Sequence, residues 1–502
     1  MTQQQILDPQ DPSLHDGKHD LVGHLGTGSL IFLIIAASAP LTVVAGGAPT
    51  SFAVTEMAGV PLGYLVLGIV ILFFSVGYAA MSSRVTNAGA IYAYTAAGLG
   101  KRQGLAVAWL ALVSYNAMQI GLYGIFGFVL AITLDAMAGI TVSWWLCALT
   151  GWLLTAILGA MNIDASAKVI GVLVLLEFFI VGAVDFFALS TPADGYPMGG
   201  FDVPEFVSSP GVGAALAFGM AAFMGFESAT IYTEETKNPR KTIPRATYGA
   251  VTIIALFYAF SVWAVQVGIG ETLVIDKSIE MGPELVFWYL AETGHPVLAD
   301  LGRVVFITSL FAALFAFHNA IARYILTLGR EGVLPEFLGR TSPKTHAPIG
   351  GSLTQSALAF VCIIGFAAYG AVTGAPFEFP VIVMFGWLTN AGAFGIVFLL
   401  FITALSCVFF FRGDASINLF SRVISPVLAM IGLGFVFIEI LIHFDVLVGA
   451  EGFSPLVIGM PTVILLTGVL GLIRGEWLRR NRPAVFDRIG TGHGVEFDNQ
   501  HT

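Results

Sequence analysis

Long apolar runs separated by short polar stretches dominate the chain. A membrane-crossing helix needs about 20 predominantly apolar residues, and by this measure the pattern predicts twelve crossing helices. The predicted spans are residues 28–55, 61–82, 104–134, 143–161, 166–190, 211–232, 247–270, 297–328, 351–373, 380–411, 420–446 and 455–475. Several are longer than the minimum, which indicates tilt or an internal break. The more polar stretch 83–103 is predicted to lie along the membrane surface.

Composition makes the membrane assignment secure. Of the 502 residues only 11% are charged and 57% are hydrophobic, whereas a soluble domain carries about 25% charged residues. The outer surface must therefore face a lipid bilayer, and the chain is predicted to be an all-α integral membrane protein. Lysine and arginine form no cluster suited to nucleic acid. The three cysteines, Cys147, Cys362 and Cys407, form no CxxC pair, so neither a metal site nor another cofactor is predicted.

The distribution of basic residues predicts the orientation, because cytoplasmic loops are enriched in lysine and arginine. Basic residues fall in alternate loops and in the tails: Lys18, Arg84, Lys101, Arg102, Lys237, Arg240, Lys241, Arg245, Arg330, Arg340, Lys344, Arg412, Arg422 and those between 474 and 488. Only Lys277 and Arg303 fall clearly on the other side. The pattern predicts a multi-pass protein of the cell membrane, with cytoplasmic tails over residues 1–27 and 476–502. The first 20 residues do not resemble a cleavable signal peptide.

Two predicted spans contain residues that interrupt a membrane helix. Residues 34–49 read IIAASAPLTVVAGGAP, in which Pro40 cannot donate a backbone hydrogen bond. The sixth span contains Gly225 and the carboxylate of Glu227 within an apolar run. Unwound backbone in lipid survives only inside the protein or beside water. Such breaks offer peptide N–H groups to a carboxylate and carbonyls to an ammonium group. An ordinary proline kink is the alternative for the first span.

The sixth span and its flank resemble a known superfamily. The run F-x-G-F-E-x6-E-E-x-K-N-P-R-K-x-I-P-x-A, residues 223–246, resembles the sixth-helix signature of the amino acid–polyamine–organocation (APC) superfamily. Residues 84–100 and 322–349 resemble its segments after helices two and eight. The resemblance implies a LeuT-like fold. It has a ten-helix transport core over 28–411, built from inverted repeats at about 28–190 and 211–411, with two further helices over 420–475.

The resemblance also implies a site and an activity. The activity is secondary active transport of a small amine-bearing solute, with an amino acid as the expected substrate, by alternating access and with the proton as the expected coupled ion. In the superfamily, backbone at the two breaks holds the substrate. Carried over to this chain, the substrate-binding residues are Ala37, Ser38, Ala39, Pro40, Leu41 and Thr42, together with Ala221, Phe223, Met224, Gly225 and Phe226. The chain departs from the pattern in two places. Ala37-Ser38-Ala39 replaces Gly-Ser-Gly, and Ala221 stands where several relatives carry a gating aromatic residue.

Coupling to an ion gradient requires a group that changes charge within the membrane. Glu177 and Glu227 are the two candidates for a proton or cation site, since ionisable residues inside a membrane are functional by default. The alternative is a structural carboxylate paired with a hydroxyl or amide group. Thr308 and Ser309 resemble in placement the hydroxyls that bind sodium in relatives, although helix hydroxyls more often bond their own backbone. Glu234, Glu235, Lys237 and Arg240 are predicted to form an inner-gate ion-pair network, with a solvated charge cluster as the alternative.

Other functions remain open at this stage. A polyamine or other organic amine is the alternative substrate, and sodium coupling or exchange is the alternative mode. A channel would require rings of like residues along a pore, which two broken helices do not suggest. A membrane enzyme would require a nucleophile with its base or closely spaced metal ligands. The nine histidines are scattered without an HExxH motif, so an enzyme is not predicted.

Overall fold

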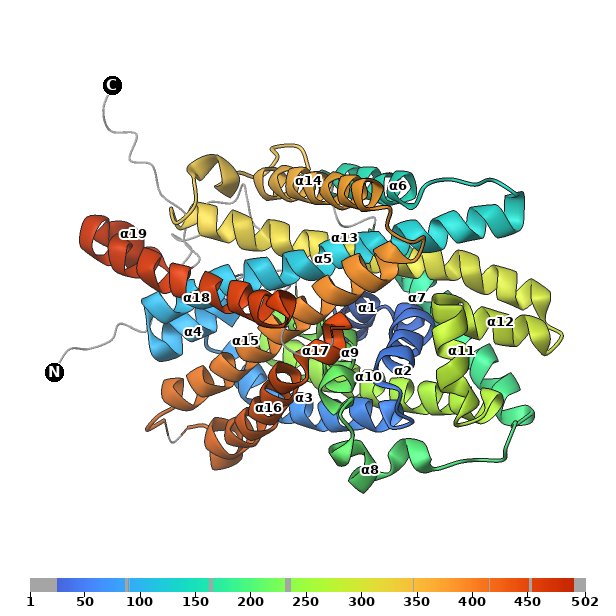
Figure 1. Cartoon of the computed structure of the whole chain (residues 1–502). Coiled ribbons are helices and arrows are strands. Elements are labelled where there is room, and N and C mark those ends of the chain that lie inside the picture. The colour runs from blue at the N-terminus through green and yellow to red at the C-terminus, as the bar shows by residue number, and fades with distance from the viewer. Residues whose placement is uncertain are drawn as a thin grey trace.

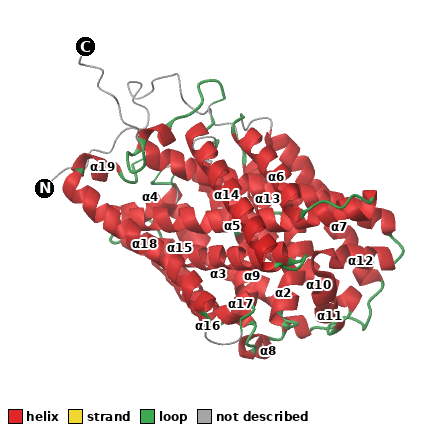
Figure 2. Cartoon of the chain, turned by 45° about the horizontal axis from the view of Figure 1, so that its top comes forward, coloured by secondary structure: helices red, strands yellow, loops and turns green. Residues whose placement is uncertain are grey.

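The computed structural model describes residues 25–85, 89, 91–161, 166–230, 236–345, 347–414, 416–450 and 454–491. Throughout these ranges the regular elements are helices, and a single isolated β-bridge joins Leu25 to Thr236. Figure 2 shows the same arrangement with its helices joined by short loops. The Glu234 and Glu235 side chains predicted at the inner gate lie outside the described residues.

The helices follow the apolar runs in order. The first group is α1 (Thr27–Ser38), η2 (Thr42–Gly47), α2 (Ala48–Thr55), α3 (Val60–Ser82), α4 (Ile91–Leu99), α5 (Lys101–Ala138), α6 (Trp144–Gly159) and α7 (Ser166–Ser190). The second is η4 (Gly199–Phe201), α8 (Val203–Ser208), α9 (Val212–Phe223), η5 (Phe226–Thr230), α10 (Pro239–Ile269), α11 (Leu273–Met281), η7 (Gly282–Glu284), α12 (Leu285–Glu292), α13 (Pro296–Arg330), η8 (Glu336–Gly339), α14 (Ile349–Thr373), η9 (Pro380–Trp387) and α15 (Leu388–Phe410). The last is η10 (Phe420–Ile424), α16 (Ser425–Ile442), α17 (Phe444–Val448), α18 (Pro455–Asn481) and α19 (Pro483–Arg488).

The described residues include ten helical segments that are long and apolar enough to cross a membrane. Two further apolar helices, α6 and α9, are shorter and coincide with the predicted fourth and sixth spans. The chain is therefore a multi-pass membrane protein. Each predicted span has an apolar helix at its position, while the exact count of twelve crossings and the division into inverted repeats stay predictions.

The helices differ in how deeply they are packed. The most apolar window of α5 is 78% buried inside the molecule, whereas the corresponding windows of α14 and α18 are only 17% buried. Figure 1 shows α14 and α18 at the periphery, while α1 and α9 lie toward the middle of the bundle. Outward-facing apolar side chains on peripheral helices are what a lipid environment requires.

The segment predicted to lie along the membrane surface contains the helix α4, which packs closely against its neighbours. Residues 91–95 of α4 are fully buried against α5 and α15. The close approach depends on small residues: a Cβ on Gly98 would collide with the Ser406 carbonyl, and one on Gly104 would lie 2.5 Å from the Ala96 Cβ. These glycines are therefore packing contacts, and the position of the segment relative to the membrane surface stays a prediction.

The C-terminal segment is ordered further than its polar sequence suggests. α18 continues to Asn481, and Ile489, after α19, is only 1% exposed. The Gly490 N–H donates to Glu331 Oε1 over 3.0 Å, and the Tyr92 hydroxyl donates to the same oxygen over 2.9 Å. The start of the tail is thereby fastened to α4 and to the end of α13. In Figures 1 and 2, α4 and α19 lie at one end of the bundle and α11 and α12 at the other.

Candidate functional site

The first span is broken in its middle. α1 ends at Ser38, and Ala39 adopts the left-handed conformation with φ 50° and ψ 77°. A non-glycine residue at positive φ is uncommon, and such strained positions cluster at functional sites. Pro40 follows and has no N–H to continue the helical ladder. Beyond it the chain passes through a π-helical turn, η2, into α2.

Glu177 of α7 holds the start of the second half of this span, beyond Pro40. Its Oε2 accepts the Leu41 N–H at 3.1 Å and the Ser309 hydroxyl at 2.7 Å. Ser309 in turn accepts the Thr42 N–H at 3.2 Å and lies 2.9 Å from the Thr42 hydroxyl. The N–H groups at the beginning of a helix attract negative charge, so a carboxylate is stabilised there. Glu177 is fully buried, and its Oε1 has no partner within the described structure.

The sixth span is broken as well, and its break touches the first. α9 ends at Phe223, and Gly225 then takes φ +104° before the short 3₁₀ helix η5. That conformation favours glycine. Space requires glycine too, because a Cβ at this position would lie 2.6 Å from the Ala37 Cβ. The two interrupted backbones therefore pack directly against each other.

Ser38 connects both breaks to a third helix. Its hydroxyl donates to the Ala222 carbonyl of α9 over 2.8 Å and forms a short hydrogen bond with the Tyr258 hydroxyl of α10. The Tyr258 hydroxyl also lies 3.3 Å from the Ser38 carbonyl. Because α1 ends at Ser38, the Ser38 carbonyl lies at the end of the helix, and the Tyr258 hydroxyl is its polar neighbour.

Glu227 lies just beyond the second break. Its Oε1 accepts the Tyr115 hydroxyl at 2.7 Å, and its Oε2 accepts the Gly225 N–H at 3.0 Å. The Tyr78 hydroxyl donates to the Glu227 carbonyl over 3.1 Å. Glu227 is 3% exposed. Both carboxylate oxygens of Glu227 accept hydrogen bonds, so Glu227 anchors the break as a structural carboxylate would. Glu177, by contrast, has one oxygen without a donor among the described residues.

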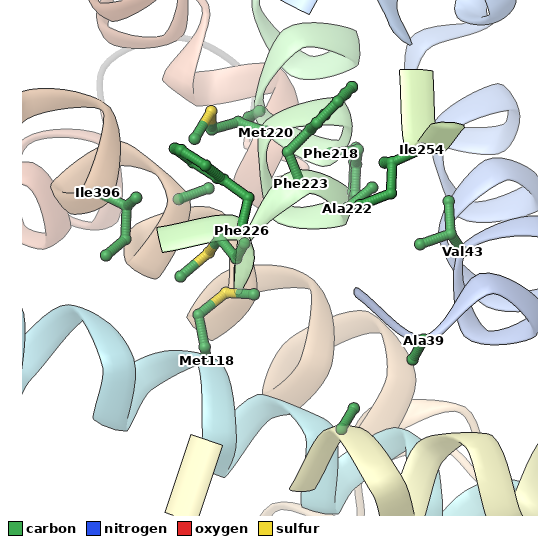
Figure 3. Packing of buried hydrophobic residues seen from close by; sticks show 14 of the residues in the cluster. Ala39, Val43, Met118, Phe218, Met220, Ala222, Phe223, Phe226, Ile254 and Ile396 are labelled. Atoms are coloured by element: carbon green, nitrogen blue, oxygen red, sulfur yellow. The ribbon is translucent and has the colours of Figure 1, made fainter. Parts of the chain in front are cut away.

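A cavity of about 50 Å³ opens between the two breaks. Its lining residues come from the first span, α5, α9, α13, η9 and α15: Ala37, Ser38, Ala39, Thr42, Val43, Gly47, Met118, Leu122, Phe218, Ala221, Ala222, Ala313, Phe317, Phe385 and Thr389. Figure 3 shows five of them, Ala39, Val43, Met118, Phe218 and Ala222, around one region of the core.

The cavity includes part of the set predicted from sequence. Ala37, Ser38, Ala39, Thr42 and Ala221 line it. The other predicted binding residues, Pro40, Leu41, Phe223, Met224, Gly225 and Phe226, are outside the lining and shape the breaks instead. Sequence reasoning missed the walls supplied by α5, α13 and α15. The one available signal was the adjacent polar pair Thr389 and Asn390 inside an otherwise apolar stretch.

Thr308, the predicted inner-gate residues and the buried His318 have simpler surroundings. The Thr308 hydroxyl bonds the Val305 carbonyl of its own helix at 2.7 Å. His318 lies 2.8 Å from the Ser352 hydroxyl and joins α13 to α14. The Lys237 N–H donates to the Leu25 carbonyl over 2.9 Å, and the side chains of Lys237 and Arg240 are exposed. The inner-gate network therefore stays a prediction. Among the described residues, no group of three or more His, Cys, Asp or Glu is placed to hold a metal ion.

Comparisons with known proteins agree with this architecture. The sequence profile of the family described as Amino acid permease matches residues 25–470. The chain is 27% identical over 327 residues to the branched-chain amino acid permease BcaP of Lactococcus lactis subsp. cremoris, covering 60% of this chain and 67% of that one. It is 25% identical over 315 residues to the low-affinity putrescine importer PlaP of Escherichia coli K12, with coverages of 61% and 67%.

Two further similarities complete the comparison. The lysine-specific permease LysP of L. lactis is 24% identical over 346 residues, covering 63% of this chain and 64% of that one. A solved structure of a sodium-coupled sialic acid symporter, in a substrate-bound outward-open state, matches with a TM-score of 0.48 and 14% identity, covering 86% of this chain and 92% of that one. Because the family profile spans most of the sequence, the chain belongs to the amino acid permease family, within the APC superfamily.

Proposed function

We propose that the protein is a secondary active transporter of a small amine-bearing solute, with an amino acid as the first candidate. The observation that carries the proposal is the meeting of two interrupted helices at one buried cavity. A solute bound there contacts backbone from both helices. Their rearrangement around it provides alternating access, as in transporters built from discontinuous helices.

The ammonium group of the solute is assigned to the ends of α1 and α9. Ala37 and Ser38 close α1, Ala221 and Ala222 lie in the last turn of α9, and all four line the cavity. The C-terminal end of a helix carries partial negative charge on its free carbonyls. Two such ends directed at one small cavity favour a cation and require no acidic side chain in the wall.

Glu177 is the proposed coupling group, with the proton as the coupled ion. Its carboxylate holds the Leu41 N–H and the Ser309 hydroxyl at the start of the second half of the first span. Protonation removes the charge that these donors stabilise, and it loosens the contact between α7 and the first break. Glu227 ranks second, because both of its oxygens are already bonded to donors that fix the second break.

Transport by reconstituted protein tests this proposal. We expect saturable uptake of labelled neutral amino acids into proteoliposomes, faster when the outside is more acidic. The reason is that a proton entering with the solute adds the energy of the pH gradient. Empty liposomes and liposomes with equal pH on both sides are the controls. Ohmic conductance without saturation would show a channel instead, and stimulation by sodium alone would show that the coupled ion is not the proton.

We also propose that the protein resides in the cell membrane with both ends in the cytoplasm. The basic residues Lys101 and Arg102 lie at the end of the bundle that carries α4 and α19, and cytoplasmic ends are enriched in such residues. A C-terminal green fluorescent protein fusion should fluoresce, while a C-terminal periplasmic phosphatase fusion should be inactive. The opposite result would invert the orientation.

A further inference from the structure

We infer that the end of α18 binds the headgroup of an anionic phospholipid, and that Arg474, Trp477 and Arg480 form the binding surface. The lipid is a second partner, separate from the solute of the proposed function, and its binding does not depend on the identity of that solute. The observations that carry this inference lie on the face that α18 leaves uncovered by the other helices.

This face of α18 is apolar and exposed over several turns. Its residues recur at intervals of three or four positions, which places them on one side of a helix. They are Leu466, Leu470, Ile473 and Trp477, each between 42% and 60% exposed. Figure 1 shows α18 at the periphery of the bundle. In a membrane protein, a continuous apolar face of this kind marks contact with lipid, so acyl chains are expected along it.

The same face becomes basic at its end. Arg480 follows Trp477 by three positions, and its side chain is 73% exposed. Because a helix rises about 1.5 Å per residue, Arg480 lies about 10 Å beyond Ile473 along the axis. Arg474 flanks the stripe, and its guanidinium carbon lies 4.5 Å from the centre of the Trp477 ring. A tryptophan ring beside basic residues at the end of a spanning helix is typical of headgroup depth.

The charge of this segment favours an anion. The whole chain has a formal net charge of -10, yet residues 474–482 contain four arginines and one glutamate. Glu476 accepts hydrogen bonds from Arg479 over 2.8 Å and from Arg480 over 2.7 Å. Arg102 of α5 adds another positive charge, 3.2 Å from Glu476. The single carboxylate therefore holds the guanidinium groups in place while most of their positive charge remains uncompensated.

An anionic lipid fits both parts of this surface. Guanidinium groups bind phosphate oxygens through charge-assisted hydrogen bonds, and basic clusters directly beyond a membrane helix are typical of anionic-lipid binding. A soluble phosphate would contact the basic end and leave Leu470 and Ile473 without a partner. A zwitterionic phospholipid would bring its own cation to the arginines. Phosphatidylglycerol, whose headgroup carries one uncompensated negative charge, satisfies the stripe and the arginines together.

Thermal unfolding of the purified full-length protein in detergent tests this binding. We expect added phosphatidylglycerol to raise the melting temperature by about 2–4 °C more than phosphatidylcholine with the same acyl chains, because a ligand that binds only the folded state raises its apparent stability. Glycerol phosphate, which lacks acyl chains, should give no comparable increase. Equal increases with the two lipids, or an increase with glycerol phosphate as large as that with phosphatidylglycerol, would overturn the inference.

Variants then assign the effect to this surface. Arg474→Gln combined with Arg480→Gln should reduce the difference between the two lipids to less than half, whereas the corresponding pair of lysine substitutions should retain most of it, since lysine keeps the charge. Arg340→Gln combined with Arg412→Gln removes the same charge from two exposed residues elsewhere in the chain and should leave the difference unchanged.

The comparison of lipids is made within each variant, so a change in basal stability does not obscure it. An unchanged difference in the Arg474→Gln and Arg480→Gln pair, or an equal loss in the control pair, would overturn the assignment to this surface. These measurements require no uptake. Their failure would therefore leave the proposed transport function standing, and a protein that transports no amino acid or amine could still show the preference for phosphatidylglycerol.

Discussion

Glu177→Gln is expected to leave the protein folded and to abolish the stimulation of uptake by an acidic exterior. The amide oxygen of glutamine can still accept the Leu41 N–H and the Ser309 hydroxyl that Glu177 holds at 3.1 and 2.7 Å. The break in the first span therefore keeps its support, but the side chain can no longer take up and release a proton. Initial uptake rates across external pH 5 to 8, with the interior held constant, measure the effect.

Asp185 provides the control for this experiment. It is a second buried carboxylate on α7, and its Oδ2 accepts the Ser261 hydroxyl at 2.8 Å, away from both breaks. Asp185→Asn should keep the pH stimulation, and both variants should elute as monodisperse protein with melting temperatures close to that of the wild type. A Glu177→Gln protein that remains stimulated by acid would remove Glu177 from coupling. Loss of stimulation in Asp185→Asn alone would move the coupling site to Asp185.

Gly225→Ala should eliminate transport by forcing the two breaks apart. The substitution places a Cβ 2.6 Å from the Ala37 Cβ, on backbone with φ +104°. A side chain at such a positive φ costs about 1–2 kcal/mol, and overpacking a tight core costs about 1–3 kcal/mol more. The break must shift to relieve this strain, and the cavity between the breaks changes shape with it. Uptake and the melting temperature in detergent are the measurements.

Gly182→Ala is the matched control for the effect of replacing a glycine. Gly182 lies within α7, where an added Cβ meets no atom within 4 Å and φ is not positive. It should be neutral or slightly stabilising, because alanine favours a helix over glycine by about 1 kcal/mol. Wild-type uptake by Gly225→Ala would show that close contact between the two breaks is not required for transport.

Much of this architecture could be predicted from the order of residues. The apolar runs located every candidate span, because lipid imposes a length and a composition on each crossing helix independently of the others. Pro40 and Gly225 marked the two breaks, because the missing N–H of proline and the backbone freedom of glycine are local properties of those residues. Glu177 and Glu227 stood out because charge is costly in an apolar run.

The contacts that these residues make could not be predicted from the sequence and are seen only in the folded structure. Glu177 forms hydrogen bonds with Leu41 and Ser309, which are 136 and 132 positions away in the sequence. No local sequence pattern predicts contacts between residues so far apart. The packing of α4 depends on glycines fitted against other helices, and the cavity is formed by several segments that are distant in the sequence. The sequence by itself determined which segments are apolar enough to be candidate membrane spans and where two of them break. Tertiary packing alone decided which groups face each break and which face the cavity, because that depends on how distant helices are brought together.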